Sequence, residues 1–184
     1  MSLQLPDSYK LQFKRADIEK AIGRIALQVS EWIDRQFNEK DADLLAIPVL
    51  RGGIFFFADL IKEVQKSVEI APVRAWAYES NQNAKQLSKI QISAEGIDVS
   101  GRRVLVLDDI CDSGRTLKVI HEEFIRAGAR EVRSAVLVKR IDGNSLFQPD
   151  WIGFEFEGPQ WLVGYGMDDR ERWRNLADIY IIDN

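Results

Sequence analysis

Residues 104–117, Val-Leu-Val-Leu-Asp-Asp-Ile-Cys-Asp-Ser-Gly-Arg-Thr-Leu, decide the fold that the sequence predicts. The apolar run from Val104 to Leu107 predicts a buried strand of a parallel sheet. We expect that strand to end at Asp108 and Asp109, and residues 112–116 to form a loop that leads into a helix. Ligands bind at the ends of parallel strands in open α/β sheets, and a loop that opens a helix offers free backbone N–H groups to a phosphate. The stretch therefore predicts a phosphate site at a strand end.

Two carboxylates beside a phosphate loop are unusual, because like charges repel one another. Asp108 and Asp109 suit a ligand that also carries hydroxyl groups for them to bind. A sugar phosphate carries both kinds of group, so it is the ligand class that the stretch favours.

Length and composition limit the class of protein. A chain of 184 residues with 46% hydrophobic and 29% charged residues predicts one globular domain. The net charge of −4 argues against a nucleic-acid partner, and no apolar run reaches the ~20 residues of a membrane span. The single cysteine, Cys111, cannot form an internal disulfide, and the N-terminus lacks a signal-peptide core. We therefore expect a soluble, cytoplasmic protein with no nucleic-acid or membrane partner.

Strand and helix patterns alternate along the rest of the chain. Apolar residues recur at spacings of three and four from Asp17 to Phe37, which predicts a helix. Residues 76–95 are poor in large apolar side chains, and a stretch of that length predicts a lid or loop. The other expected elements are an irregular entry over 1–16, strands over 44–50, 68–75, 132–138, 151–156, 161–163 and 179–182, and a helix over 54–64. This alternation predicts an open, mostly parallel sheet flanked by helices.

Other phosphate-binding motifs do not fit the stretch. A Walker A loop needs a glycine five positions before Gly114, where Asp109 stands, and a lysine at the position of Arg115. No Gly-x-Gly-x-x-Gly follows any expected strand, so a dinucleotide site is excluded as well. A response regulator would use acidic strand ends but has no need of Ser-Gly-x-Thr directly after them.

The apolar strand, the acidic pair and the loop Asp112-Ser113-Gly114-Arg115-Thr116 together resemble the signature of type I phosphoribosyltransferases. The resemblance implies an α/β fold with an open, mostly parallel twisted sheet flanked by helices and a small hood built from the terminal segments. It also implies that the loop binds the 5-phosphate of phosphoribosyl pyrophosphate (PRPP). Asp108 and Asp109 would then hold the ribose hydroxyls.

The resemblance narrows to the hypoxanthine-guanine branch along the rest of the chain. Val49-Leu50-Arg51-Gly52-Gly53 is similar to the pyrophosphate loop of that branch, which implies pyrophosphate contacts from Arg51, Gly52 and Arg174 and a cis peptide at Leu50–Arg51. Asp112 would be the catalytic general acid or base at purine N7. Ile110, Lys139, Trp161, Leu162 and Asp168 match base-binding positions, and Asp108, Asp109 and Asp168 match positions that bind Mg²⁺.

The family pattern also divides the chain. We expect one domain over 1–184, with a core over roughly 17–140 and 176–184, a hood over roughly 1–16 and 145–175, and a lid over roughly 76–95. Tyr78 would be the lid residue that covers pyrophosphate, although Ala77 replaces the serine that usually precedes it. Members of the family are commonly homodimers or homotetramers.

These residues also have ordinary structural interpretations. Lys139 and Arg140 can be solvated strand ends, Trp161 a core residue, and Cys111 a small core residue beside the loop. His121, on an amphipathic helix, is expected to be structural. The order of the motifs favours the functional interpretations, and the family resemblance implies a purine-salvage enzyme that joins hypoxanthine or guanine to PRPP and releases pyrophosphate. The alternatives are a sister enzyme for another base, such as xanthine, and a non-catalytic PRPP-sensing regulator with the same fold.

Overall fold

A computed structural model gives the fold and describes residues 4–36, 44–78, 89–94, 96–141, 143 and 145–183. Within these ranges a seven-stranded sheet contains the stretch that the sequence singled out, with neighbouring strands in the order β5-β4-β2-β6-β7-β8 and β3 beside β2. Only the β4–β5 pair is antiparallel. The bounds are β2 Leu44–Leu50, β3 Glu69–Ile70, β4 Val73–Tyr78, β5 Lys89–Ser93, β6 Arg103–Cys111, β7 Glu131–Ile141 and β8 Trp151–Glu157. This sheet confirms the predicted mostly parallel α/β class.

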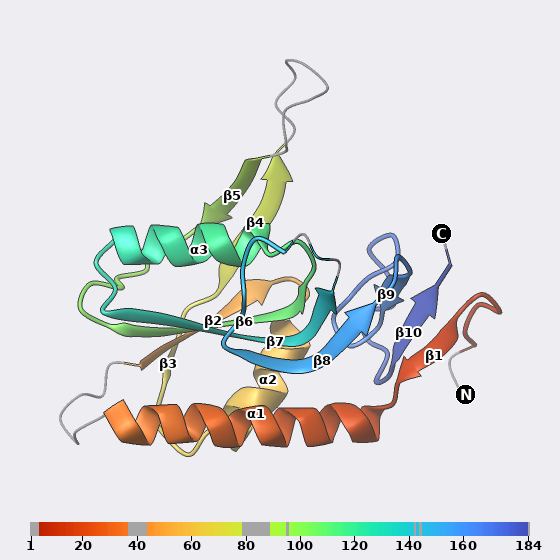
Figure 1. Ribbon diagram of the computed structural model, residues 1–184, viewed down its shortest axis with the longest axis horizontal. Helices are drawn as coiled ribbons and strands as arrows, with labels where there is room; N and C mark the ends of the chain where they lie inside the picture. Colours follow the sequence, from red (N-terminus) through yellow and green to blue (C-terminus); the bar gives the residue numbers. More distant parts are fainter. Residues whose placement is uncertain are drawn as a thin grey trace.

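Helices cover both faces of the sheet (Figure 1). The helices α1 (Arg15–Gln36) and α2 (Ile54–Glu63) lie on one face, and α3 (Arg115–Arg126) lies on the other. Leu105 and Leu107 pack in the core under α1 and α2, whereas Val104 and Val106 pack in the core under α3. Side chains alternate between the two faces of a strand, so a strand covered on both sides is apolar throughout. None of the described helices is long and apolar enough to cross a membrane.

Strands β6 and β7 run further than predicted. Strand β6 continues past Leu107 to Cys111, because β7 continues beside it and pairs with it as far as Cys111 and Lys139. The expectation that the strand ends at Asp108 and Asp109 is therefore wrong. The acidic pair lies inside the last part of β6, and both residues line one cavity at that end of the strand.

A small antiparallel sheet forms the hood. Its strands are β1 (Lys10–Phe13), β9 (Trp161–Val163) and β10 (Ile179–Ile182), in the order β1-β10-β9. Three expectations about these segments are wrong. Residues 1–16 contain the strand β1, and β10 belongs to the hood. Strand β8 belongs to the large sheet, because it pairs with β7. β1 has no recognisable pattern because three of its four residues are exposed. The two sheets touch where the rings of Phe13 and Phe154 stack at 4.2 Å.

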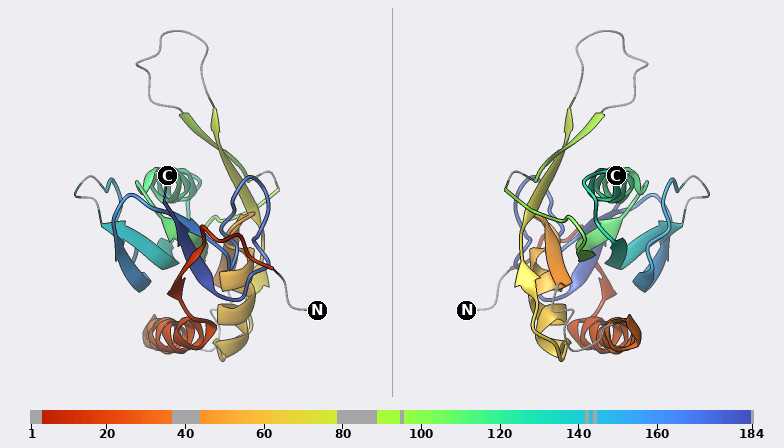
Figure 2. Two further views of the ribbon diagram at one scale, coloured as in Figure 1. Left: turned by 90° about the vertical axis from the view of Figure 1, so that its right-hand side faces the viewer. Right: turned by 90° about the vertical axis from the view of Figure 1, so that its left-hand side faces the viewer.

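The predicted lid begins and ends as a pair of strands. β4 and β5 form an antiparallel pair that stands out from the body of the molecule (Figure 2). Residues 79–88, which make up half of the predicted lid, and the side chains of Ala77 and Tyr78 lie outside the described part of the chain. The role expected for Tyr78 stays a prediction.

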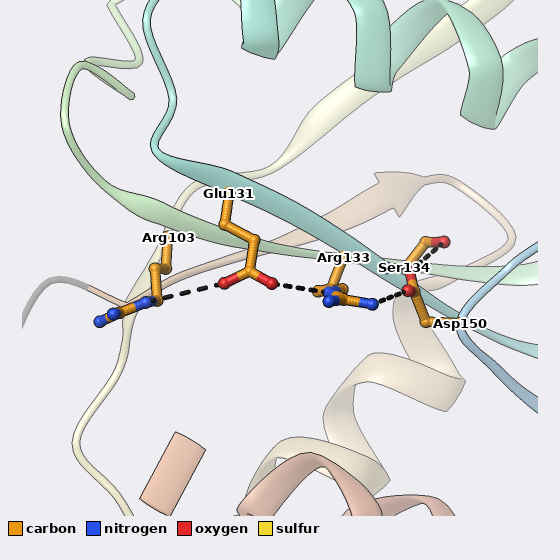
Figure 3. A network of polar contacts seen from close by, with 5 residues as sticks. All are labelled: Arg103, Glu131, Arg133, Ser134 and Asp150. Carbon is orange, nitrogen blue, oxygen red and sulfur yellow. Dashed lines mark hydrogen bonds and ion pairs between the residues drawn. The ribbon is translucent and has the colours of Figure 1, made fainter. Parts of the chain in front are cut away.

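An ion-pair network joins the starts of β6, β7 and β8, at the opposite end of these strands from the predicted site (Figure 3). Glu131 pairs with Arg103 at 3.7 Å and with Arg133 at 2.8 Å, and Arg133 pairs with Asp150 at 2.6 Å. The carboxylate of Asp150 also accepts the backbone N–H of the buried Ser134 at 2.8 Å. The network therefore fixes the chain just before β8 against β7.

Candidate active site

The acidic pair of β6 is buried, with Asp108 and Asp109 each 7% exposed. Backbone N–H groups support it, since the amide of Asp109 donates to Asp108 Oδ1 at 3.0 Å and the amide of Ile110 donates to Asp109 Oδ1 at 2.9 Å. Burial raises the pKa of Asp108 well above its usual range, and the charge of Asp109 raises it further. Burial also raises the pKa of Asp109, although its hydrogen bonds oppose the shift. The ligand-free pair therefore holds protons more tightly than exposed carboxylates do.

The predicted pyrophosphate loop packs directly on this pair. A Cβ atom on Gly52 would overlap the carboxylate of Asp109, so a larger residue at position 52 would displace that buried carboxylate. The amide of Gly53 donates to the carbonyl of Val49 at 3.0 Å, and α2 begins at the next residue. The peptide bond Leu50–Arg51 is cis, as the family resemblance implied.

The predicted phosphate loop opens α3. Gly114 precedes the helix with φ 75°, and a Cβ atom there would lie 2.9 Å from Phe147. The carbonyl of Ser113 accepts the amide of Leu146 at 2.9 Å, which attaches the loop to the segment after β7. The first N–H groups of a helix have no partner inside the helix, so they are available to an anion. A cavity of about 260 Å³ lies here, and its lining includes Asp108, Asp109, Ile110, Asp112, Ser113, Gly114, Arg115 and Thr116.

A larger cavity of about 560 Å³ adjoins the first. Trp161 lies on it with half of its surface exposed, and the indole Nε1–H donates to the carbonyl of Asp168 at 2.6 Å. The lining also includes Ile110, Asp112, Arg140, Leu162 and Asp168. Ala75, Asp109, Ile110, Asp112 and Thr116 line both cavities, so the two cavities share a wall. The structure thus brings the phosphate loop and most of the predicted base-binding residues together.

Lys139 is the predicted base-binding residue that does not line the larger cavity. Its side chain is buried, and its Nζ contacts Oε1 of Gln148 beside a separate cavity of about 370 Å³. Neighbouring side chains on a strand point to opposite faces, and Arg140 reaches the larger cavity instead. The alternation along β7 was the pattern that could have identified Arg140.

The two arginines predicted to bind pyrophosphate meet at one carboxylate. Arg51 pairs with Glu171, and Arg174 lies 3.6 Å from the same Glu171 oxygen and 2.7 Å from Asp168 Oδ1. Arg174 also donates to the carbonyl of Gly166 at 2.7 Å. Sequence reasoning missed Glu171, because nothing distinguishes it in the charged run from Asp168 to Arg174. A position between Arg51 and Arg174 is thus suited to an anion.

The predicted magnesium ligands do not form a metal cage. In the part of the chain that the structure describes, no group of three or more His, Cys, Asp or Glu side chains is arranged to hold a metal. Mg²⁺ is usually bound by one or two carboxylates together with waters and substrate phosphates. Asp109 and Asp168 line the larger cavity and Asp108 lines the smaller one, so their expected role at Mg²⁺ stays a prediction.

Comparison with known proteins agrees with this arrangement. Residues 14–170 match the phosphoribosyl transferase domain family. The chain belongs to this family. It is 27% identical over 176 residues to the hypoxanthine-guanine phosphoribosyltransferase of Aquifex aeolicus, with 95% of each chain covered. It is 30% identical over 177 residues to the enzyme of the same name from Bacillus subtilis, covering 96% of this chain and 94% of the relative.

Structural similarity extends over the whole fold. A solved structure named hypoxanthine-guanine-xanthine phosphoribosyltransferase superposes with a TM-score of 0.77 at 25% sequence identity, and covers 97% of this chain and 100% of its own. The resemblance indicated by the sequence motifs is confirmed, and the chain is a phosphoribosyltransferase enzyme.

Proposed function

We propose that this phosphoribosyltransferase transfers the 5-phosphoribosyl group of PRPP to N9 of hypoxanthine or guanine and releases pyrophosphate. One observation carries the proposal: the smaller cavity, built from a phosphate loop and an acidic pair, shares a wall with a larger cavity bordered by Ile110 and Trp161. Asp112 stands on the shared wall. The names of the relatives from A. aeolicus and B. subtilis support a 6-oxopurine as the acceptor.

The smaller cavity would bind the sugar phosphate. The N–H groups at the start of α3 and the side chains of Ser113 and Thr116 would hold the 5-phosphate. The carboxylates of Asp108 and Asp109 would accept hydrogen bonds from the ribose hydroxyls. These hydroxyls would add donors to the backbone N–H groups that already bind the acidic pair.

The larger cavity would bind the base against the ring of Trp161, with Ile110 on the opposite side. As N9 forms its bond to ribose carbon 1, the bond from that carbon to the pyrophosphate oxygen breaks. Asp112 would accept the proton that leaves N7 of the base, so the purine product is neutral. Its place on the shared wall puts it between the ribose site and the base site.

Positive charge would stabilise the leaving group. Arg51 and Arg174, which meet at Glu171 in the free protein, would exchange that carboxylate for pyrophosphate. Magnesium bound together with PRPP supplies further positive charge to the pyrophosphate.

The test is pyrophosphate release from PRPP and Mg²⁺ with hypoxanthine, guanine, xanthine, adenine or orotate, each in a separate reaction. We expect release with hypoxanthine or guanine. Release with adenine or orotate alone would contradict the 6-oxopurine assignment. Release with none of the bases would contradict catalysis, and tight PRPP binding in that case would favour the regulator. Xanthine belongs in the series because one structural relative has xanthine in its name.

We also propose, from the family resemblance, a cytoplasmic homodimer or homotetramer. Cys111 is buried and unpaired, which suits a reducing compartment. Sedimentation velocity would measure the mass of the assembly, and a monomer at micromolar concentration would contradict the proposed assembly.

A further inference from the structure

Arg140 lies at the larger cavity with a side chain that is only 13% exposed. Its Nε donates to Oδ1 of Asp112, its Nη1 donates to the carbonyl of Gly158, and its Nη2 donates to the carbonyl of Gln160 at 3.1 Å. We infer that Arg140 is a positioning residue that holds the carboxylate of Asp112 and the turn before Trp161 in fixed relation. This inference rests on the proposed function, because it concerns how Asp112 and Trp161 meet the same base.

The three partners of Arg140 come from two separate parts of the chain. Asp112 follows the end of β6, and Gly158 and Gln160 form the turn between β8 and β9. Arg140 lies near the end of β7, between those two parts. No backbone pairing joins residue 112 to residues 158–160. The guanidinium is therefore a direct link between the proposed acid–base group and the strand that begins at Trp161.

The chemistry of the contact favours arginine over lysine. A guanidinium carries five N–H donors in a rigid planar fork, and three separate acceptors use that fork here. The ring of Phe156 lies beneath it, with Cζ 5.2 Å from the ring centre. A lysine at residue 140 could pair with Asp112, but its single ammonium could not also reach both carbonyls. Asp112 itself is 59% exposed, and its contact with Arg140 restrains the direction of its carboxylate.

The experiment separates the contact of Arg140 with Asp112 from its contacts with the turn before Trp161. Arg140→Met keeps the apolar stem and removes every donor, whereas Arg140→Lys keeps the charge and loses the fork. Each change is made in the unmodified enzyme and in Asp112→Asn. For each protein, kcat, the KM for hypoxanthine, the Kd for PRPP and the thermal midpoint are measured. Arg133→Met is the matched control, because Arg133 lies on the same strand in the ion-pair network away from the site.

We expect Arg140→Met to lower kcat by about 100-fold, the loss that a misplacement of about 1 Å can cause. The KM for hypoxanthine should rise, while the Kd for PRPP changes by less than about twofold, because the phosphate loop keeps its contacts. Arg140→Lys should restore most of kcat and leave the KM raised. In Asp112→Asn, Arg140→Met should lower kcat no further than about twofold, since the residue through which it acts is already disabled. Arg133→Met should change the thermal midpoint only.

Several results would overturn the inference. Additive losses of kcat in the double variant would show that Arg140 doesn't act through Asp112. Equal losses in Arg140→Met and Arg140→Lys, in proportion to a fall in thermal midpoint, would show a merely structural role. If Arg140→Met fails to fold, Arg140→Lys decides alone, and an unchanged KM for hypoxanthine overturns the inference. Inactivity of the unmodified enzyme with every base would instead overturn the proposed function.

Discussion

Asp108 and Asp109 are buried carboxylates, and the hydrogen bonds that they accept offset the cost of their burial only in part. Burial raises the pKa of both, and the hydrogen bonds that they accept come from neighbouring backbone amides. Such a pair stabilises a bound polyol more than it stabilises the free fold, because like charges in a buried site repel. Removing one of the two charges should therefore stabilise the fold and weaken ligand binding.

Asp108→Asn should raise the thermal midpoint of the ligand-free protein at pH 7 by about 2–4 °C, the effect of ~1 kcal/mol in a chain of this size. The folded-state pKa of Asp108 lies above its unfolded value, so the unmodified protein loses stability as pH rises above about 4. Asparagine does not titrate, and the advantage of the variant should vanish below that pH. Calorimetry between pH 3 and pH 8 measures it, and a midpoint difference that does not change with pH would contradict it.

Asp112 offers a second prediction at this scale. Asp112→Asn should lower kcat by about 10²–10⁴-fold, the usual contribution of a general acid or base, and leave the Kd for PRPP nearly unchanged. The reason is that the phosphate loop and the acidic pair, which would hold the sugar phosphate, stay intact. Steady-state kinetics and calorimetric titration of PRPP measure the two quantities. Equal losses in both would remove the proposed role at N7.

At the scale of elements, the two ends of the strands in the large sheet have different roles. The site lies at the ends of β6 and β7, whereas the ion-pair network joins their starts to the chain before β8 (Figure 3). Ser134 is 3% exposed, and its backbone N–H donates a hydrogen bond to the carboxylate of Asp150. The network should therefore affect stability and leave the chemistry unchanged.

Asp150→Ala should lower the free energy of unfolding by about 2 kcal/mol, because it leaves a buried amide without an acceptor. The thermal midpoint should fall by about 4–8 °C, and kcat and both KM values should stay the same. Glu122→Ala is the control, since its contact with Lys118 is exposed and 4.0 Å long, and its cost should be below about 0.5 kcal/mol. A change in kcat or in either KM of more than twofold in Asp150→Ala would show that the network and the site are not independent.

At the scale of the whole molecule, sequence reasoning succeeded where the relevant contacts are local or the burial is two-sided. The strand 44–50 was predicted at its observed bounds because helices cover both of its faces, and the phosphate loop lies within one continuous stretch. Distant pairings were missed. β1 pairs with β10 across almost the full chain, and Arg140 meets Asp112, and Arg51 meets Glu171, across 28 and 120 residues.

Ligand binding supplies the prediction at this scale. PRPP with Mg²⁺ at 100 times its Kd should stabilise the folded state by about 2.7 kcal/mol, which corresponds to a rise of about 5–10 °C in thermal midpoint. Thermal scans with and without PRPP measure it, and Asp108→Asn should show much less protection at the same concentration. Equal protection in both proteins would contradict the proposed ribose contacts of the acidic pair.

The position of the ion-pair network has a consequence for how the enzyme can evolve. Arg133 and Arg140 lie on the same strand and are separated by about 23 Å, at roughly 3.3 Å per residue. Effects of changes at such distances usually add, so stability gained around Glu131 and Asp150 can offset stability lost at the cavities. Stabilising substitutions in the ion-pair network could therefore allow variants with new base preferences to stay folded, in the laboratory or in nature.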